Sequence, residues 1–437
     1  LFTKSNFTRN NFFNLILALI PVSFIAGNMI ININLLLIII SAFLYFNKNL
    51  FKIKFYFLDK LIFLYFFLIL FSSIINDYYF YTEGMSWKGY FSTVLKSIFF
   101  FKYLLLYIII RFLIEKKIID LKLFFISCSF ATVFVSLDIL FQFFNGKDIF
   151  GFVGEGRKLA GPFGDELIAG GFIQRFSLFA FFLVPLFFQK ITSSKINNYI
   201  VPFLFIIFFL GLILSGNRMP TLIFLFSIFL VLIFQKQTRK FLIPFVIIFI
   251  LVFSILFKTN NSIRINFLGL YDQISKITIL IINKDFFNEN SPQYLKEFSS
   301  FYDTWLMNMY IGGGIKNFRY YCHERPNINE NANFICNMHP HNYYLEIMTE
   351  TGILGLILVV FIFLNILYLS FIKKYFLRSP LNTNNFIIPF IFLFIAEVFP
   401  LKSTGSFFTT GNATYIFLIV GILIGLIRNE NSVENKT

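Results

Sequence analysis

The sequence predicts an all-α protein, a polytopic transmembrane helical bundle of about twelve spans with one large polar loop between the ninth and tenth spans. Three observations predict this class. Hydrophobic residues make up 57% of the 437 residues, and the mean hydropathy is +0.76. Charged residues amount to only 14%, about half the usual share of a globular domain. Apolar runs of about 15–23 residues, close to the thickness of a bilayer core, recur along the whole chain.

The apolar runs set the expected order of spans. They lie near 12–27, 30–46, 61–75, 91–114, 121–144, 167–189, 199–215, 219–234, 241–257, 353–371, 386–400 and 413–427. Residues 1–144 therefore form an N-terminal group of spans, and 372–437 form a C-terminal group with a tail. The central region, 145–371, contains a short polar loop at 145–166 and the long polar loop at 258–342.

Basic residues alternate along the connections between the expected spans, which predicts the topology. They occur at Lys4 and Arg9; Lys48, Lys52, Lys54 and Lys60; Arg111, Lys116, Lys117 and Lys122; Lys190 and Lys195; Lys236, Arg239 and Lys240; Lys373, Lys374 and Arg378; Arg428 and Lys436. The positive-inside rule then puts both termini in the cytoplasm. Because the net charge of +15 is spread over short loops, it does not indicate a nucleic-acid partner.

Two of the three cysteines lie in the long polar loop. If this loop faces an oxidising compartment, a disulfide between Cys322 and Cys336 is favoured over two free thiols. Such a bridge would close a loop of about 15 residues and stabilise the fold by roughly 3 kcal/mol. Cys128 falls inside the fifth span, where a small packing residue is expected.

All three histidines of the chain, His323, His339 and His341, lie near the end of the same loop. With the disulfide in place they could offer three nitrogen ligands to zinc, but their spacing fits no usual zinc signature. We therefore predict no metal site and no cofactor. A purely structural role is one alternative, and catalysis by a histidine that titrates near neutral pH is the other.

The segment after His341 reads "NYYLEIMTETG" and predicts a short helix at the outer membrane surface. Asn342 can cap its first turn, and Gly352 can end it in a left-handed conformation. Asn342, Glu346 and Glu350 are four residues apart and fall on one face. The alternative is an ordinary interfacial helix whose carboxylates face water.

Two arginines lie near the outer ends of spans. Arg218 occurs in "LSGNRMP" and Arg175 in "GDELIAGGFIQRF". Ionisable groups at such depth are usually functional or paired, and arginine binds phosphate through two hydrogen bonds. The alternatives are contact of Arg218 with lipid phosphates and an ion pair of Arg175 with Asp165 or Glu166.

A glycine run in the long loop, "IGGGIKNFRYYC", offers backbone N–H groups that could surround a phosphate. A tight turn is the favoured interpretation. No nucleotide-binding signature follows the run, so ATP is not expected.

Taken together, these motifs resemble the O-antigen ligase and O-antigen polymerase superfamily. "MHPHNYYLEIMTETGILGL" is similar to its His-Asn…Leu…Glu…Gly signature, and "LSGNRMPTLIF" is similar to its Ser-Gly-x-Arg turn. "TWLMNMYIGGGIKNFRYYC" resembles its Trp-containing helix with a Gly-x-Gly turn, and "RKLAGPFGDELIAGGFI" its earlier Gly-x-Phe outer loop. The resemblance covers about 145 to 371, with the motifs in the family's order.

The resemblance implies a glycosyltransferase of the bacterial inner membrane. Its donor would be a glycan on undecaprenyl diphosphate, and its acceptor a hydroxyl of lipid A–core or of a growing glycan. The loop 258–342 would be periplasmic. Arg218 and Arg175 would hold the donor diphosphate, His341 would act on the acceptor, and Glu350 would support the site.

Further residues are expected to contact the substrates, beginning with His339 and Asn342 beside His341. Many relatives carry a basic residue shortly before the Trp, whereas this chain has "EFSSFYDTW". Arg264 and Arg319 are the candidate substitutes for that contact.

The chemistry of the reaction agrees with this choice of residues. A glycosyl diphosphate contains a good leaving group, so the enzyme must stabilise the released charge and deprotonate the acceptor. The outer loops lack a cluster of carboxylates for Mg²⁺, so arginine is expected in its place, with inversion at the anomeric carbon. The alternatives are a polymerase with the same motifs and, from a different class, a flippase or transporter. A transporter of this kind is expected to show related halves, which this chain does not.

Overall fold

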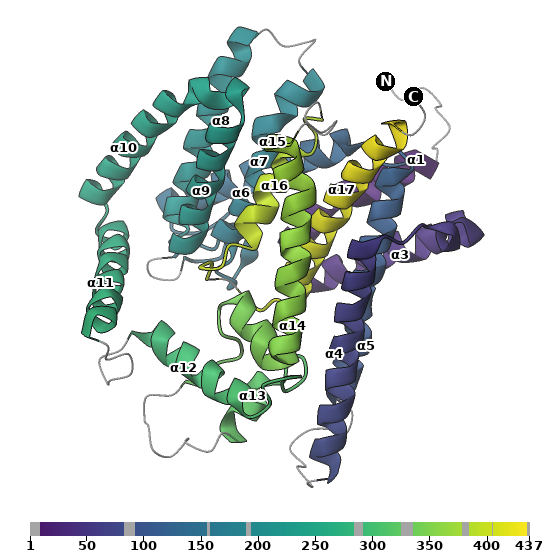
Figure 1. The fold of residues 1–437 in the computed structure, drawn as a ribbon. Helices are drawn as coiled ribbons and strands as arrows, with labels where there is room; N and C mark the ends of the chain where they lie inside the picture. Colours follow the sequence, from purple (N-terminus) through teal and green to yellow (C-terminus); the bar gives the residue numbers. More distant parts are fainter. Residues whose placement is uncertain are drawn as a thin grey trace.

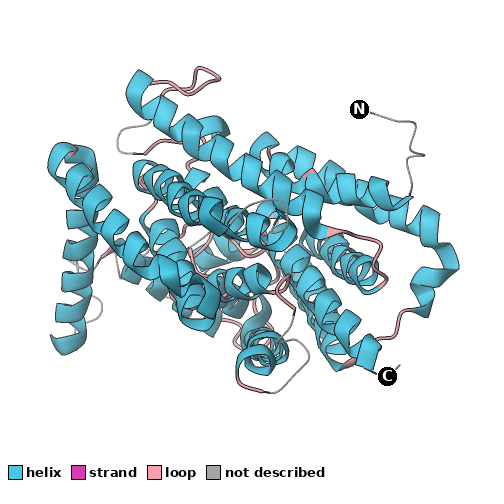
Figure 2. Ribbon diagram, turned by 90° about the horizontal axis from the view of Figure 1, so that it is seen from above, coloured by secondary structure: helices cyan, strands magenta, loops and turns pink. Residues whose placement is uncertain are grey.

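The computed structural model describes residues 9–82, 92–154, 158–188, 194–283, 292–324, 335–377, 384–403 and 405–434 (Figure 1). These parts of the chain are helical, with no β-strand among them and one isolated bridge between Lys147 and Val153 (Figure 2). The expected all-α class is therefore confirmed. Four of the basic residues used to predict topology, Lys4, Lys190, Arg378 and Lys436, lie outside the described residues.

The helices follow the expected order of apolar runs. The first part of the chain forms α1 (Arg9–Ala18), α2 (Ile20–Ala26), α3 (Asn28–Phe46), α4 (Phe57–Thr82), α5 (Ser92–Glu115), α6 (Leu121–Asn145), α7 (Ala169–Leu183), α8 (Ser194–Leu214), α9 (Arg218–Phe234) and α10 (Leu242–Thr259). The second part forms α11 (Asn261–Asn283), α12 (Gln293–Leu306), α13 (Phe318–Tyr321), α14 (Tyr343–Leu367), α15 (Lys373–Tyr375), α16 (Ile388–Glu397) and α17 (Thr410–Glu434). Short 3₁₀ and π turns, η1 (Asn47–Lys52), η2 (Gly161–Phe163), η3 (Val184–Phe188), η4 (Lys236–Phe241), η5 (Cys322–Glu324) and η6 (Tyr368–Ile372), extend or connect them.

Among the described residues, nine helical segments are long and apolar enough to cross a membrane, which makes the chain a multi-pass membrane protein. Three shorter apolar helices, at Asn198–Leu214, Arg218–Phe234 and Ile388–Glu397, occupy the positions of the remaining expected spans. The ten residues of α16 rise only about 15 Å, half of a bilayer core. The described residues therefore contain nine candidate spans, and the expected number of about twelve is not confirmed.

The last helix, α17, lies in the centre of the bundle and packs along α5 (Figure 1). Its sequence "GILIG" places Gly421 and Gly425 against α5, where an added Cβ would lie 3.2 Å and 2.7 Å from Ile110 and Ile114. Two glycines four residues apart allow two helix backbones to approach closely. The close contact between α17 and α5 therefore depends on glycine at these two positions, where a larger residue would push the helices apart.

A group of buried ionic side chains fastens α17 to α4 and α5. The fully buried Asp59 pairs with Arg111 and, at 2.9 Å, with Arg428. Glu115 lies 3.2 Å and 3.3 Å from the same two arginines. The group lies at the end of the bundle where α1 begins and α17 ends (Figure 1).

The long polar loop is more helical than a loop implies, because α11, α12 and α13 all fall within 258–342. These helices lie at the end of the bundle opposite the end of α17 (Figure 1). Helix α9, which begins at Arg218, and helix α14, which begins two residues after His341, both start toward this end (Figure 1).

Candidate functional site

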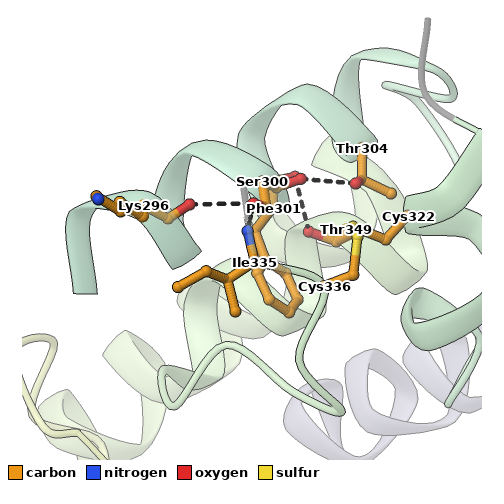
Figure 3. Close-up of a disulfide and its surroundings, with 8 residues drawn as sticks. All are labelled: Lys296, Ser300, Phe301, Thr304, Cys322, Ile335, Cys336 and Thr349. Carbon is orange, nitrogen blue, oxygen red and sulfur yellow. Dashed lines mark hydrogen bonds between the residues drawn. A yellow bond between two sulfur atoms is a disulfide. The ribbon is translucent and has the colours of Figure 1, made fainter. Parts of the chain in front are cut away.

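The disulfide joins the two halves of the outer segment. Cys322 and Cys336 are bonded to each other, with their Cα atoms 5.9 Å apart (Figure 3). Beside the bridge, the rings of Phe301 and Phe318 stack, and both are buried. The hydroxyl of Thr349 donates to the carbonyl of Phe301 at 3.4 Å (Figure 3). These contacts form a small second core that fixes α12 and α13 on the start of α14.

Helix α14 is broken at Gly352, and the glycine run explains the break. Gly352 has φ 69° and ψ −176°, so the helix ends there with a positive φ, as its sequence predicts, and restarts one residue later. The amides of Ile353 and Leu354 lose their helical partners and donate instead to the carbonyls of Met309 and Tyr310, at 2.8 Å and 3.3 Å. An added Cβ at Gly352 would lie 2.1 Å from the Tyr310 carbonyl oxygen.

The three glycines at 312–314 follow this crossing. The amides of Gly313 and Gly314 donate to the carbonyls of Thr349 and Glu350 at 3.0 Å and 2.9 Å. A Cβ at Gly312 would meet the backbone of residues 350–352 at 2.5 Å. The run therefore forms a tight turn that lies directly on α14, as the sequence predicts, and its amides are used inside the protein.

Both carboxylates of the short helix are buried. Glu346 and Glu350 are each 2% exposed, so the alternative of a helix whose acidic face meets water is wrong. The Glu350 carboxylate accepts a hydrogen bond from the amide of Lys316 at 2.7 Å, and Glu346 accepts from the amide of Phe407 at 2.6 Å. Each carboxylate therefore holds a piece of loop backbone in place.

The two histidines of "HPH" lie side by side just before α14, with ring centroids 4.5 Å apart. Burial, together with the neighbouring His341, lowers the pKa of His339 to about 4, so His339 is neutral at physiological pH. His341 itself has φ 53°, the left-handed region that non-glycine residues seldom adopt. Such a conformation persists only where the surroundings impose it, and it occurs preferentially at functional sites.

The residues after His341 supply that constraint. Asn342 caps α14, its side-chain oxygen accepting from the amides of Tyr344 and Leu345, as the sequence predicts. Its side-chain nitrogen donates to the carbonyl of Pro400 at 2.7 Å. The hydroxyl of Tyr344 donates to the carbonyl of Val398. The start of α14 is thus tied at successive residues to the segment that follows α16.

The third tie, through Tyr343, reaches a buried ionic group. The carboxylate of Glu397 accepts hydrogen bonds from the hydroxyl of Tyr343 at 2.7 Å, from Arg175 Nη2 at 2.7 Å and from Lys402 Nζ at 2.6 Å. Arg175 Nη2 also donates to Asn412 at 2.6 Å. Burial, partly offset by Glu397, lowers the pKa of Lys402 to about 8.

This group corrects one expectation. Arg175 is paired, but its carboxylate is Glu397 and not Asp165 or Glu166, both of which are exposed. The sequence could not identify the partner because Glu397 is 222 residues away. Nε and Nη2 of Arg175 are both directed at this carboxylate.

Arg218 is the first residue of α9. Its Nε donates to the amide oxygen of Asn266 at 2.6 Å and its Nη1 to that of Gln273 at 3.2 Å, both on α11. Asn266 in turn donates to the carbonyl of Gly216 at 3.0 Å. Helix α11 therefore sets the direction in which the guanidinium points.

The remaining candidates differ in position. Arg319 lies on α13 with its Nη1 4.0 Å from the sulfur of Met338, the residue before His339 in the sequence. Arg264 is exposed on α11 and bonds to Asn261, one turn away. His323 is exposed in η5. Within the described ranges, no three His, Cys, Asp or Glu side chains are grouped closely enough to share a metal ion.

The structure also brings in residues that the sequence did not single out. Lys316, in the glycine run, has φ 53° and lies beside Glu350; burial lowers the pKa of its amine. Lys96 of α5 donates to the carbonyl of Lys316 at 3.4 Å. Glu397 and Lys402 form the ionic group beneath α14. A lysine two residues after three glycines was a usable signal, but the other three residues have no local motif.

This arrangement defines a class of protein: a multi-pass membrane protein in which a histidine with a constrained backbone precedes a short helix that carries two buried carboxylates. Residues 203–360 match the family model described as O-antigen ligase. The match extends from α8 into α14 and confirms the resemblance to the O-antigen ligase superfamily that the motifs predicted. No curated protein sequence matches the chain.

Proposed function

We propose that this protein is a membrane glycosyltransferase of the ligase type, which transfers a glycan from undecaprenyl diphosphate to a hydroxyl of lipid A–core. The observation that carries the proposal is the position of the family match. Residues 203–360 include Arg218 at the outer turn, the glycine run, and His341 with the helix it precedes. The proposed base, the proposed phosphate-binding arginine and the glycine run thus all lie within the segment that the family model covers.

The reaction needs a base for the acceptor. His341 takes the acceptor proton as the acceptor oxygen bonds to the anomeric carbon. In the same step the bond from that carbon to the diphosphate oxygen breaks, and undecaprenyl diphosphate leaves. His341 suits this role because its backbone is held in an unusual conformation by the contacts of residues 342–344 with 397–400. A direct displacement inverts the anomeric centre.

The reaction also needs positive charge where the diphosphate develops its own negative charge. Arg218 fills this role, with its planar group oriented by α11 and suited to bidentate phosphate contacts. Arg319, beside the histidines, supplies the third phosphate contact that the sequence left in doubt, and the exposed Arg264 is the weaker candidate. We assign Arg175 to positioning α14 rather than to the donor.

The remaining residues support the site in two ways, by contact with the acceptor and by fixing a loop. His339, neutral at physiological pH, and Asn342 lie on either side of His341 and are placed to contact the acceptor. Glu350 fixes the loop that carries Lys316. We propose that Arg218, Arg319 and Lys316 neutralise the charge of the leaving diphosphate without a metal ion.

The basic connections support an orientation with both termini in the cytoplasm and the α11–α13 face in the periplasm of a bacterial inner membrane. Single cysteines introduced on α11 should react with a membrane-impermeant reagent added outside. Reaction only after the inner membrane is opened would reverse the orientation and exclude the donor assignment.

The test in cells is to delete the gene and separate the lipopolysaccharide on a gel. Bare core together with accumulated lipid-linked polymer is expected for a ligase. Core that bears a single repeat would instead identify a polymerase.

The test in vitro uses purified protein, lipid-linked glycan and acceptor. His341→Ala should lower the transfer rate roughly 10²–10⁴-fold while donor binding persists. His323→Ala is the matched control and should have little effect, because His323 is exposed in η5. Arg218→Lys should still impair turnover, since lysine cannot make the bidentate contact. Full activity of His341→Ala would refute the base assignment, and loss of activity on EDTA that zinc restores would establish a metal.

A further inference from the structure

We propose that a cavity at the end of the bundle opposite His341 binds one acyl chain of an anionic membrane phospholipid. The cavity measures about 460 Å³, within the usual range for ligand sites. It lies between α7, α8, α9, α10 and the start of α16. This inference is independent of the proposed transfer reaction.

The walls of the cavity are apolar. Leu178, Phe181 and Phe182 of α7 face Val231 and Leu232 of α9 across the space, and all five are buried. Polar side chains occur at one end only, where Gln235, Gln237, Thr238, Lys240 and Asn385 form the rim. A cavity that is apolar inside and polar at one rim matches a molecule with a hydrocarbon chain and a polar head.

The sequence explains why this space is not filled. Helix α7 ends in the π turn η3, which contains Pro185, and a π turn departs from regular α-helical packing. Helix α9 ends where Gln235 becomes extended, with φ −102° and ψ 100°, before η4 begins. Two neighbouring helices therefore stop being regular at the same depth, and their ends leave the gap.

The rim carries positive charge. The segment 235–241 contains Lys236, Arg239 and Lys240 and no acidic residue. The adjoining α15 adds Lys373 and Lys374, and the segment 372–377 has no acidic residue either. A hydrogen bond from Gln235 to the hydroxyl of Tyr375 joins the two segments at the rim.

The positive charge at the rim favours a lipid with an anionic headgroup. Basic residues beside a membrane surface attract anionic lipids by about 1 kcal/mol each. Lys240 is one of the residues that line the cavity, and its Nζ donates to the side chain of Asn198. A lipid phosphate at the mouth would meet Lys240, while the acyl chain would run between α7 and α9.

The experiment measures lipid binding to the detergent-purified chain by native mass spectrometry, with phosphatidylglycerol and phosphatidylcholine as probes. One phosphatidylglycerol should remain bound per chain, and phosphatidylcholine should bind more weakly. Ile228→Trp fills the cavity and should lower the affinity for phosphatidylglycerol by about tenfold or more. Lys240→Gln should lower the preference for phosphatidylglycerol about fivefold.

Two control variants match these changes. Ile243→Trp adds the same side chain at a residue of α10 that is 70% exposed. Lys258→Gln removes the same charge at the other end of α10, where Lys258 is exposed. Both should bind phosphatidylglycerol like the parent. Val231→Phe is a second cavity-filling variant in case Ile228→Trp does not fold, with folding checked by circular dichroism.

Equal retention of phosphatidylglycerol by the parent and by both cavity-filling variants would overturn the proposal. So would equal binding of the two lipids with no effect of Lys240→Gln, because the site would then not recognise an anionic head. Retention of a polyprenyl phosphate, but not of phosphatidylglycerol, would assign the cavity to a different lipid and would also overturn it.

Discussion

Replacing Glu397 by Gln should separate the positioning of His341 from the stability of the bundle. The carboxylate of Glu397 is 2% exposed and is the common partner of two cations. Its Oε1 accepts from Arg175 Nη2 and from the hydroxyl of Tyr343, both at 2.7 Å. Its Oε2 accepts from Arg175 Nε at 3.2 Å and from Lys402 Nζ at 2.6 Å.

The expected losses of stability and of transfer rate follow from the contacts that glutamine cannot make. The side chain keeps its shape, but one oxygen becomes an NH₂ group that faces donors, and two buried cations lose their negative partner. Removal of one member of a buried ion pair costs about 3–5 kcal/mol. For the site, the same change releases Tyr343 and with it the start of α14. A displacement of about 1 Å at a catalytic group lowers the rate roughly 10²-fold, which is the loss expected for transfer.

The assay compares two variants at a temperature at which both remain folded. Asp59→Asn makes the same change in a buried carboxylate that holds Arg111 and Arg428 at the other end of the bundle. Both variants should melt at lower temperature, but only Glu397→Gln should lose transfer. Adding Lys402→Met to Glu397→Gln removes one unpaired cation and should recover part of the stability but not the activity. Equal loss of transfer in the two single variants would refute the positioning role.

Three further outcomes are expected. Reduction of the bridge, or replacement of Cys322 and Cys336 by Ser, should lower the free energy of unfolding by about 3 kcal/mol, measured by denaturation with and without reductant. Burial lowers the pKa of Lys402 from 10.5 to about 8 in the folded protein. Between these two pH values the unfolded chain binds one more proton at Lys402 than the folded chain does. Stability should therefore rise by about 3 kcal/mol between pH 8 and pH 10.5, and Lys402→Met should flatten that rise. Gly352→Ala should cost more than about 2 kcal/mol, because φ is 69° and the new Cβ meets a carbonyl oxygen at 2.1 Å; Gly171→Ala, with nothing within 4 Å, is the control.

The sequence predicts the local features of the site well. The cap at Asn342, the break at Gly352 and the Cys322–Cys336 pair each depend on residues close together in the chain, where backbone geometry and capping act. The fold class and the order of helices follow from the apolar runs for the same reason. These features need no knowledge of which helices become neighbours.

The features that escape prediction depend on packing between distant elements. Glu397 lies 222 residues from Arg175, and only the meeting of α7 and α16 makes them partners. The burial of Glu346 and Glu350 could not be predicted either, because α14 is covered by the loop before α13 and by the segment before α17. The expected number of about twelve spans is not confirmed, because α8, α9 and α16 are apolar but shorter than the nine candidate spans of the described residues.

The break at Gly352 has a mechanical consequence for a protein in a bilayer of variable thickness. Membrane helices respond to hydrophobic mismatch by changing their tilt. In a continuous α14, a change of tilt in residues 353–367 would swing His341 through an arc. Here the helix is interrupted, its outer part is bonded to residues 397–400, and the crossing at 309–314 holds the joint. The span can therefore adapt to the lipid while the histidine keeps its place against the segment that orients it.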